Sequence, residues 1–393
     1  MKNSVFTLLI TLILTGILFS QQFSPAITDA KRLIYDDSGE FREGFCSIKK
    51  GNKWGFMDTS GNIVLDFKYE LSSWQIGWLY FQNGLCRIPT SEQGKKVFIY
   101  IDTNFKEVIK LTDVADATDF SGDRALVFPA TKPSRLYFID KSGKEVAGSS
   151  KNYNFIAGIK PLVFSEGAYV YFDPGKSKYI YVDNKGKQII NGEFEDAMPF
   201  SEGLAAVQTL TNTNERKWGF IDINGNVVID YKFSEKPGDF SEGLASVTDR
   251  QFKKGYINTK GEVVVKPAYN AAYPYFMGHA LTTDLNGTYL IDTVGNVVKN
   301  LGNDGLAVLG LDKERQMYTI SLGVGYVFGT MTPMGEMIFP PSSKTNETER
   351  VFPFMTPFYS DRAYARAYIG NSTVEGFIDI KGNFVIIREE EQF

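Results

Sequence analysis

The residues best suited to catalysis are scarce in this chain. It contains one histidine, His279, and two cysteines, Cys46 and Cys86, among 393 residues. A Ser/His/Asp or Cys/His apparatus would have to be built on His279 alone, and a zinc site would need cysteines that lie far from it in the sequence. We therefore predict no catalytic residue, no metal site and no cofactor, and we do not expect an enzyme.

Carboxylates are plentiful, and a glycosidase would need only two of them. Their spacing is repetitive, however, because an aspartate recurs three residues before a glycine slot. Asp at the first position of a type I turn, with Gly at the fourth, lets the side chain bond forward to the turn backbone while glycine accepts the positive φ. The stretch Asp222-Ile-Asn224-Gly-Asn226 is loosely similar to a calcium loop but lacks the terminal glutamate. We predict a structural role for the recurring aspartates: Asp58, Asp102, Asp140, Asp183, Asp222, Asp292 and Asp379.

The same spacing divides the chain into about nine units of about 40 residues, a period typical of repeat arrays. Each turn joins two apolar segments, so it predicts a strand, a tight turn and a second strand. A second motif, clearest in Glu202-Gly203-Leu204-Ala205, adds a turn and a third short strand. The glycine slots are Gly61, Phe105 (in place of glycine), Gly143, Gly186, Gly225, Gly261, Gly295, Gly335 and Gly382.

The strand before each turn is apolar on both faces, so each hairpin needs cover that stacked copies can supply. Long helical patterns are absent, which supports an all-β class. We predict tandem β-hairpin or three-stranded repeats, about nine units in one array. An open superhelical array is favoured over a propeller-like closed ring, because propellers usually have about 4–8 blades and the period is uneven.

Two stretches carry a resemblance to a known family. They are Lys53-Trp54-Gly55-Phe56-Met57-Asp58, followed by Gly61, and Lys217-Trp218-Gly219-Phe220-Ile221-Asp222, followed by Gly225. With the Glu-Gly motifs before them, they resemble the WG-repeat family of bacterial proteins, also called KWG repeats. The resemblance covers essentially the whole chain after its N-terminal segment. It implies a β-repeat scaffold of surface and secreted proteins that serves interaction, with no catalytic residues to transfer.

The N-terminus has the features of an export signal. A lysine precedes an apolar run that ends in small and polar residues, as in a secretory signal peptide. We predict a signal peptide over residues 1–22 and one β-repeat domain over residues 23–393, with no transmembrane domain after cleavage.

The last third of the chain departs from the repeat. Its copies drift over residues 299–340, and the polar stretch 340–357 is expected to form a loop. Insertions in repeat arrays often lie on the binding face, so this loop is a candidate partner-specific element.

Five side chains outside the turn slots are candidates for special roles. Cys46 and Cys86 occupy the same slot of neighbouring units, so they can form a disulfide in an oxidising compartment or simply fill a small buried slot. Trp74, Trp78 and Tyr80 lie between two units. If exposed, they could stack on sugars or anchor a peptide, and core packing is the alternative.

The formal net charge is −4 and no basic run exists, which argues against nucleic acid as a partner. We predict an exported, non-enzymatic repeat scaffold that mediates protein or peptide binding in the cell envelope, with the periplasm, the cell surface or the medium as its location. The alternative function is a glycan- or cell-wall-binding module that uses exposed aromatics.

Overall fold

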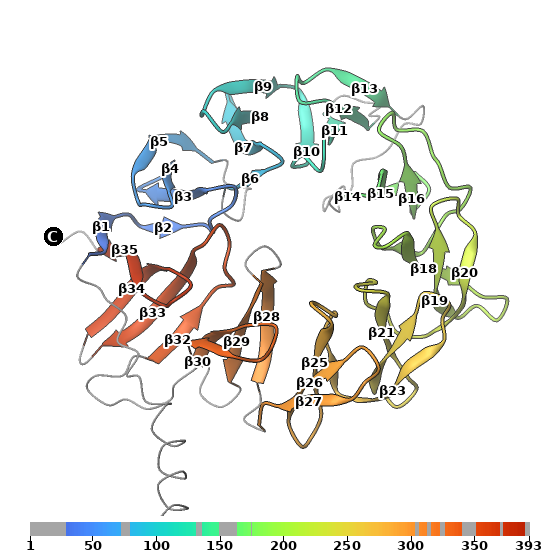
Figure 1. Cartoon of the computed structure of the whole chain (residues 1–393). Helices are drawn as coiled ribbons and strands as arrows, with labels where there is room; N and C mark the ends of the chain where they lie inside the picture. Colours follow the sequence, from blue (N-terminus) through green and yellow to red (C-terminus); the bar gives the residue numbers. More distant parts are fainter. Residues whose placement is uncertain are drawn as a thin grey trace, which may run out of the picture.

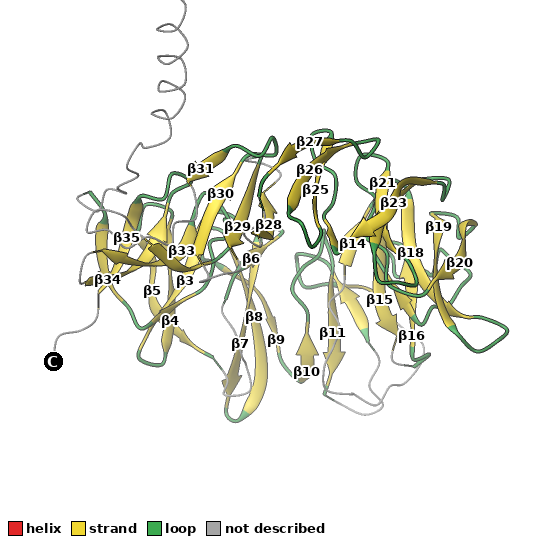
Figure 2. Cartoon of the chain, turned by 90° about the horizontal axis from the view of Figure 1, so that it is seen from below, coloured by secondary structure: helices red, strands yellow, loops and turns green. Residues whose placement is uncertain are grey.

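The protein is a ring of nine small antiparallel sheets, a nine-bladed β-propeller (Figure 1). The computed structural model describes residues 29–71, 79–130, 136–148, 163–173, 175–302, 306–312, 316–322, 327–339, 351–369 and 372–389. Among these residues every regular element is a strand. A view at right angles to the first shows that the strands run across the thickness of the ring (Figure 2). The all-β class and the nine repeat units are therefore confirmed.

Consecutive strands of each blade pair in order, and the last strand of most blades lies at the outer margin of the ring (Figure 1). Blades 1 to 3 contain β2 (Asp37–Ser38), β3 (Phe45–Lys50), β4 (Lys53–Asp58) and β5 (Ile63–Glu70); β6 (Phe81–Gln82), β7 (Leu85–Glu92), β8 (Lys95–Asp102) and β9 (Glu107–Leu111); and β10 (Val114–Ala117), β11 (Ala125–Pro129), β12 (Tyr137–Ile139) and β13 (Glu145–Gly148). Blades 4 to 6 contain β14 (Val163–Ser165), β15 (Ala168–Asp173) and β16 (Lys178–Val182); β17 (Asp196–Ala197), β18 (Leu204–Leu210), β19 (Arg216–Asp222) and β20 (Val227–Phe233); and β21 (Leu244–Thr248), β22 (Lys254–Asn258) and β23 (Val263–Tyr269). Blades 7 to 9 contain β24 (Ala271–Ala272), β25 (His279–Thr283), β26 (Thr288–Asp292) and β27 (Val297–Asn300); β28 (Leu306–Asp312), β29 (Met317–Leu322), β30 (Val327–Met331) and β31 (Met337–Phe339); and β32 (Val351–Met355), β33 (Ala363–Ile369), β34 (Ser372–Ile378) and β35 (Phe384–Glu389), the last paired with β1 (Lys31–Ile34).

The repeated aspartate organises the turn between the last two strands of a blade. In blade 5, Asp222 Oδ1 accepts hydrogen bonds from the backbone N–H groups of Asn224 (2.9 Å) and Asn226 (2.8 Å). Gly225 closes the turn at φ +82°, and a Cβ there would lie 2.7 Å from Ile190 Cγ2 of blade 4. Glycine is thus required both by the left-handed backbone and by the neighbouring blade.

The glycine of the Trp-Gly pair permits a close crossing of two backbones. Trp218 pairs with Phe233 and Phe220 with Ile229, so the outer strand contains two extra residues opposite Gly219. A Cβ on Gly219 would lie 2.7 Å from the Ile229 carbonyl oxygen, which is too close for any side chain. The pair therefore marks blades whose outer strand is bulged in this way.

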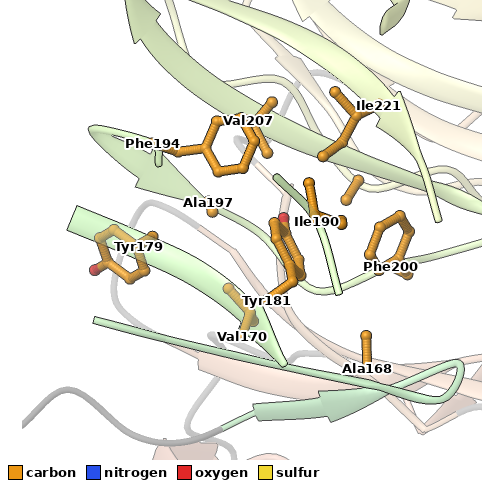
Figure 3. Close-up of a cluster of buried hydrophobic side chains, with 11 residues drawn as sticks. Ala168, Val170, Tyr179, Tyr181, Ile190, Phe194, Ala197, Phe200, Val207 and Ile221 are labelled. Carbon is orange, nitrogen blue, oxygen red and sulfur yellow. The ribbon is translucent and has the colours of Figure 1, made fainter. Parts of the chain in front are cut away.

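Adjacent blades are joined by pairs of aromatic rings. The aromatic residue in the third strand of one blade packs on the aromatic residue that precedes the Glu-Gly motif of the next, as for Phe220 and Phe240, whose centroids are 4.9 Å apart. Figure 3 shows the buried cluster between blades 4 and 5, where Tyr181 and Phe200 lie 5.1 Å apart. Edge-to-face and tilted geometries of this kind add to the free energy gained by burial.

The same ring pair closes the propeller, which corrects our expectation of an open superhelical array. Phe377 of blade 9 packs on Phe41 of blade 1 at 4.8 Å, and β1 adds a fifth, parallel strand to β35. The propeller-like closed ring, our alternative, is the observed form. The expectation was wrong because the sequence period defines only the repeat unit. Ring closure depends on a contact between residues at opposite ends of the chain.

The drifting repeats still form a blade, since residues 306–339 contain the four strands of blade 8. Residues 340–350 of the expected loop lie outside the described residues. Its remainder includes β32, the first strand of blade 9, so the loop expected over residues 340–357 ends earlier than we predicted.

Candidate functional site

The Glu-Gly motif forms a tight two-residue turn between the first two strands of a blade, as blade 5 shows. Glu202 (φ +54°) and Gly203 (φ +79°) both have left-handed backbone, and the flanking Ser201 and Leu204 exchange backbone hydrogen bonds of 2.9 and 3.2 Å. This is the geometry of a type I′ hairpin turn. A left-handed conformation at a residue other than glycine costs about 1–3 kcal/mol, so it needs compensating contacts.

The compensating contacts reach into the next blade. The Glu202 carboxylate accepts hydrogen bonds from the backbone N–H groups of Glu242 (2.6 Å) and Gly243 (2.8 Å), and Ser201 Oγ donates to the Phe240 carbonyl (2.7 Å). We call the contact through the glutamate position the latch. The latch recurs at five other junctions, and in each the side chain of the earlier blade accepts from backbone N–H groups of the next. The acceptor and donor residues are Glu43 and Gly84; Asn83 and Gly122; Glu166 with Glu202 and Gly203; Glu242 with Met277 and Gly278; and Ser360 and Gly44. The motif therefore serves to hold the blades together.

Turns and strands of five blades line a pocket that faces the centre of the ring, which we call the axial pocket. Its volume is about 580 Å³, and it is lined by side chains from blades 5 to 9. Two aspartates and no cationic residue are among the described lining residues, which are Ser201, Asp239, Phe240, Ser241, Pro274, Leu311, Asp312, Phe358, Tyr359 and Ser360. Two carboxylates, each of which already has an interaction partner, and apolar side chains thus border the pocket.

Arginine, aspartate and tyrosine side chains of blades 9, 1, 2 and 3 form a network of ion pairs and ring contacts, which we call the network on the inner wall. The Arg42 guanidinium lies over the rings of Tyr359 (4.7 Å) and Tyr80 (5.1 Å), which come from the two neighbouring blades. Tyr80 donates to Asp119 Oδ2 (2.8 Å), and Arg87 Nε donates to Oδ1 of the same carboxylate (2.9 Å). Burial, and then the charge of Asp119, raises the pKa of Tyr80 to about 12, so its hydroxyl stays a donor.

A second pocket, the seam pocket, lies between the first and last blades. Its volume is about 270 Å³, and it is lined by residues 37–40 of blade 1 and by Phe354, Thr356, Tyr364, Arg366, Glu375 and Arg388 of blade 9. Glu375 accepts from Arg366 Nε at one oxygen (2.5 Å) and from Tyr364 Oη (3.0 Å) and Arg388 Nη1 (3.4 Å) at the other. Burial raises the pKa of Tyr364 to about 12.

Of the three predicted binding residues, only Tyr80 lies within the described part of the chain. Tyr80 belongs to the network on the inner wall, with its hydroxyl bonded to Asp119. Trp74 and Trp78 lie outside the described residues, as does the predicted signal peptide over residues 1–22.

The chemically reactive side chains are separate from one another. Cys46 and Cys86 are both buried free thiols, so the disulfide we considered is not formed in the structure. Burial raises the pKa of the Cys46 thiol, and its Sγ donates to the Gly39 carbonyl (3.3 Å). His279 Nδ1 lies 2.8 Å from the Met277 carbonyl oxygen. In the described part of the chain no three His, Cys, Asp or Glu side chains are grouped as metal ligands would be. No helix among the described residues could cross a membrane.

Sequence reasoning missed the seam pocket, although one signal pointed to it. The last copy of the repeat reads Glu375-Gly376-Phe377-Ile378-Asp379, where the clearest copy reads Trp218-Gly219-Phe220-Ile221-Asp222. A glutamate thus replaces tryptophan within an otherwise intact motif. The axial pocket had no such signal, because its lining comes from ordinary turn positions of five separate repeats.

Comparisons with known proteins agree with this architecture. A family model described as WG containing repeat matches residues 32–54, 54–71, 181–209, 218–249 and 255–282. A solved structure described as the eukaryotic initiation factor is similar at 12% identity, over 90% of this chain and 98% of that chain, with a TM-score of 0.57. The Dos1 propeller matches at 10% identity over 78% and 92% of the two chains, with a TM-score of 0.38. At 12% identity the likeness to the initiation factor concerns the fold alone, and the Dos1 match carries no argument at its TM-score. No curated protein matches the chain.

Proposed function

We propose that this chain, a nine-bladed propeller that contains WG-containing repeats, is a non-enzymatic scaffold that binds a protein or peptide in the cell envelope through its axial pocket. The observation that carries the proposal is the pocket itself, about 580 Å³ and lined from five blades. A concave site of this size at the centre of a rigid ring suits a projecting segment of a partner.

The use of the recurring polar residues supports a scaffold rather than an enzyme. The turn aspartates bond to their own turns, and the glutamates and serines of the Glu-Gly motif bond to the next blade. The groups that a repeat could offer for chemistry are therefore engaged in building the ring. The repeat sequences and the propeller fold likewise support a scaffold.

The lining of the pocket suggests the chemistry of the partner segment. Asp239 and Asp312 supply negative charge, while Phe240, Pro274 and Leu311 supply apolar surface between them. A segment that carries a basic side chain with an aliphatic stem complements both features.

Export rests on the N-terminal sequence. The lysine and apolar run within residues 1–22 have the pattern of a secretory signal peptide, which would bring the mature chain into the envelope. The proposed location therefore predicts that the protein found in cells begins near residue 23.

Site-specific photo-crosslinking tests the proposal. p-Benzoylphenylalanine would replace Pro274 in the axial pocket, and a matched variant would carry it at Asp230, an exposed position on the outer strand β20. Irradiation of intact cells should give a discrete adduct from position 274 and none, or a different set, from position 230. Identical adducts from both positions, or none from position 274, would show that the axial pocket is not the binding surface.

A further inference from the structure

The side chains that line the seam pocket stand at repeat positions that are apolar at the junction between blades 4 and 5. We call such a junction between adjacent blades a seam. Counting from the Glu-Gly turns, Phe172, Tyr179 and Phe194 of blade 4 correspond to Arg366, Glu375 and Arg388 of blade 9. Between blades 4 and 5 these side chains belong to one apolar cluster, in which Figure 3 labels Tyr179 and Phe194, and the Phe172 and Tyr179 centroids are 5.4 Å apart. Between blades 9 and 1 the three charged groups border a cavity of about 270 Å³.

The wall from blade 9 carries more positive than negative charge. Two guanidinium groups, Arg366 and Arg388, share the single carboxylate of Glu375. Arg366 uses only Nε in that contact, and Arg388 uses Nη1 there and Nε on the Tyr35 carbonyl. Each guanidinium has five N–H donors, so donors remain in a geometry that suits a planar carboxylate.

The wall from blade 1 supplies oxygen acceptors. Asp37 and Glu40 line it together with Ser38 and Gly39, and Glu40 also pairs with Arg42 at 3.2 Å. Oxygen acceptors on this wall suit a ligand group that donates hydrogen bonds and carries positive charge.

A buried tyrosine hydroxyl lies beside the pocket. Tyr35 is 2% exposed, and its hydroxyl makes no hydrogen bond of good geometry within the described residues. Ser38 and Tyr364, which line the pocket, both lie close enough to affect the pKa of Tyr35, which burial raises.

We propose that the seam pocket binds a small zwitterion of the α-amino acid class. The ligand carboxylate is held by Arg366 and Arg388, and its ammonium group faces Asp37 and Glu40. The rings of Phe354 and Tyr364 border the remaining space, so an apolar or aromatic side chain fits best. The ligand bridges the first and last blades. This site is independent of the axial pocket and of the function proposed for it.

A purely structural role for the charges would make a different prediction. If Arg366, Glu375 and Arg388 only fixed the register of the closing blades, added ligand would leave stability unchanged. A ligand that bridges both walls stabilises the closed ring in proportion to its concentration over its Kd. Ligand-dependent thermal unfolding therefore separates the two roles.

The experiment uses the full mature chain and three related probes. L-Phenylalanine carries both charges, 3-phenylpropionate lacks the ammonium group, and 2-phenylethylamine lacks the carboxylate. Isothermal titration calorimetry and thermal unfolding should show binding of L-phenylalanine, and at least tenfold weaker binding of each analogue. Equal binding of 3-phenylpropionate and L-phenylalanine would remove the zwitterion assignment, and no binding of L-phenylalanine would overturn the proposal.

Matched variants locate the site. Arg366→Gln, which leaves Glu375 with two donors and so should fold, is expected to weaken L-phenylalanine binding at least tenfold. Arg32→Gln removes the Arg32–Glu389 ion pair (2.9 Å) on the same seam, away from the described pocket lining, and should leave binding unchanged. Unchanged binding in Arg366→Gln, or an equal loss in Arg32→Gln, would contradict the assignment.

Discussion

The seams between blades 4 and 5 and between blades 9 and 1 use the same ring pair in different surroundings. Tyr181 packs on Phe200 at 5.1 Å in one, and Phe377 packs on Phe41 at 4.8 Å in the other. The chain runs continuously across the first seam, whereas only β1 and side chains cross the second. At the closing seam the ring pair is accompanied by a cavity that charged side chains line. The repeat thus specifies the contact that joins blades, and the chain ends decide where the ring can open.

The largest expected effect comes from removing the closing ring. Phe377→Ala should lower the free energy of unfolding by about 3–5 kcal/mol, because it empties a fully buried aromatic position. Phe220→Ala, at the equivalent position of blade 5, should have a similar effect on denaturant unfolding. Only Phe377→Ala should also increase the radius of gyration, measured by X-ray scattering below the unfolding transition, since the closing seam is held by the non-covalent pairing of β1 with β35 and by side-chain contacts. Equal expansion in both variants would remove the distinction between the seams.

The turn glycines should reveal how tightly each seam is packed. Gly225→Ala should cost about 1–3 kcal/mol, because alanine is strained at φ +82° and its Cβ would lie 2.7 Å from Ile190. Gly61→Ala faces Ile386 across the closing seam at 3.0 Å, so it should cost less. Urea denaturation of the two variants measures the difference, and a larger loss for Gly61→Ala would reverse our ranking.

Removing a latch should also cost more stability between blades 5 and 6 than at the closing seam. Glu202→Gly relieves the left-handed backbone but removes two hydrogen bonds to a carboxylate, for a net loss of about 1–2 kcal/mol. Ser360→Gly removes the single hydrogen bond that the Gly44 backbone N–H donates to the Ser360 hydroxyl oxygen (3.1 Å), so we expect a loss below about 1 kcal/mol. Glu202→Gln, which keeps an acceptor oxygen, serves as the control and should fall between wild type and Glu202→Gly.

The smallest effect should be confined to alkaline pH. The pKa of Tyr364 is raised to about 12, mainly by burial, whereas an unfolded tyrosine titrates near about 10. The fold therefore favours the neutral phenol, and this contribution to stability is complete below about pH 10 and lost as the pH rises towards about 12. Comparing wild type with Tyr364→Phe by denaturation across this window should show the difference shrinking as the pH rises.

The local architecture could be predicted from the sequence because its causes are local. The Asp222 and Gly225 spacing encodes a turn within five residues, and the period repeats that turn along the chain. Closure could not be predicted, because the contact of Phe41 with Phe377 joins residues at opposite ends of the chain and depends on the summed rotation of nine blades. That sum is not visible in any single repeat.

The candidate sites were predictable to different degrees. The seam pocket could have been suspected from Glu375, which stands where the repeat has tryptophan, but its arginine partners occupy ordinary strand positions. The axial pocket could not be anticipated, since Asp239 and Asp312 come together only through the curvature of the ring. The binding role of Trp74 and Trp78 stays a prediction.

The six latches found among the described residues all point the same way around the ring, each accepting hydrogen bonds from the blade that follows. The blades that they join therefore pair an acceptor on one blade with a donor on the next. Duplication of a blade by unequal recombination would preserve all of these local contacts and alter only the angle between neighbours. The number of blades is then set by curvature rather than by specific recognition, which gives such a lineage a simple route to rings of different size.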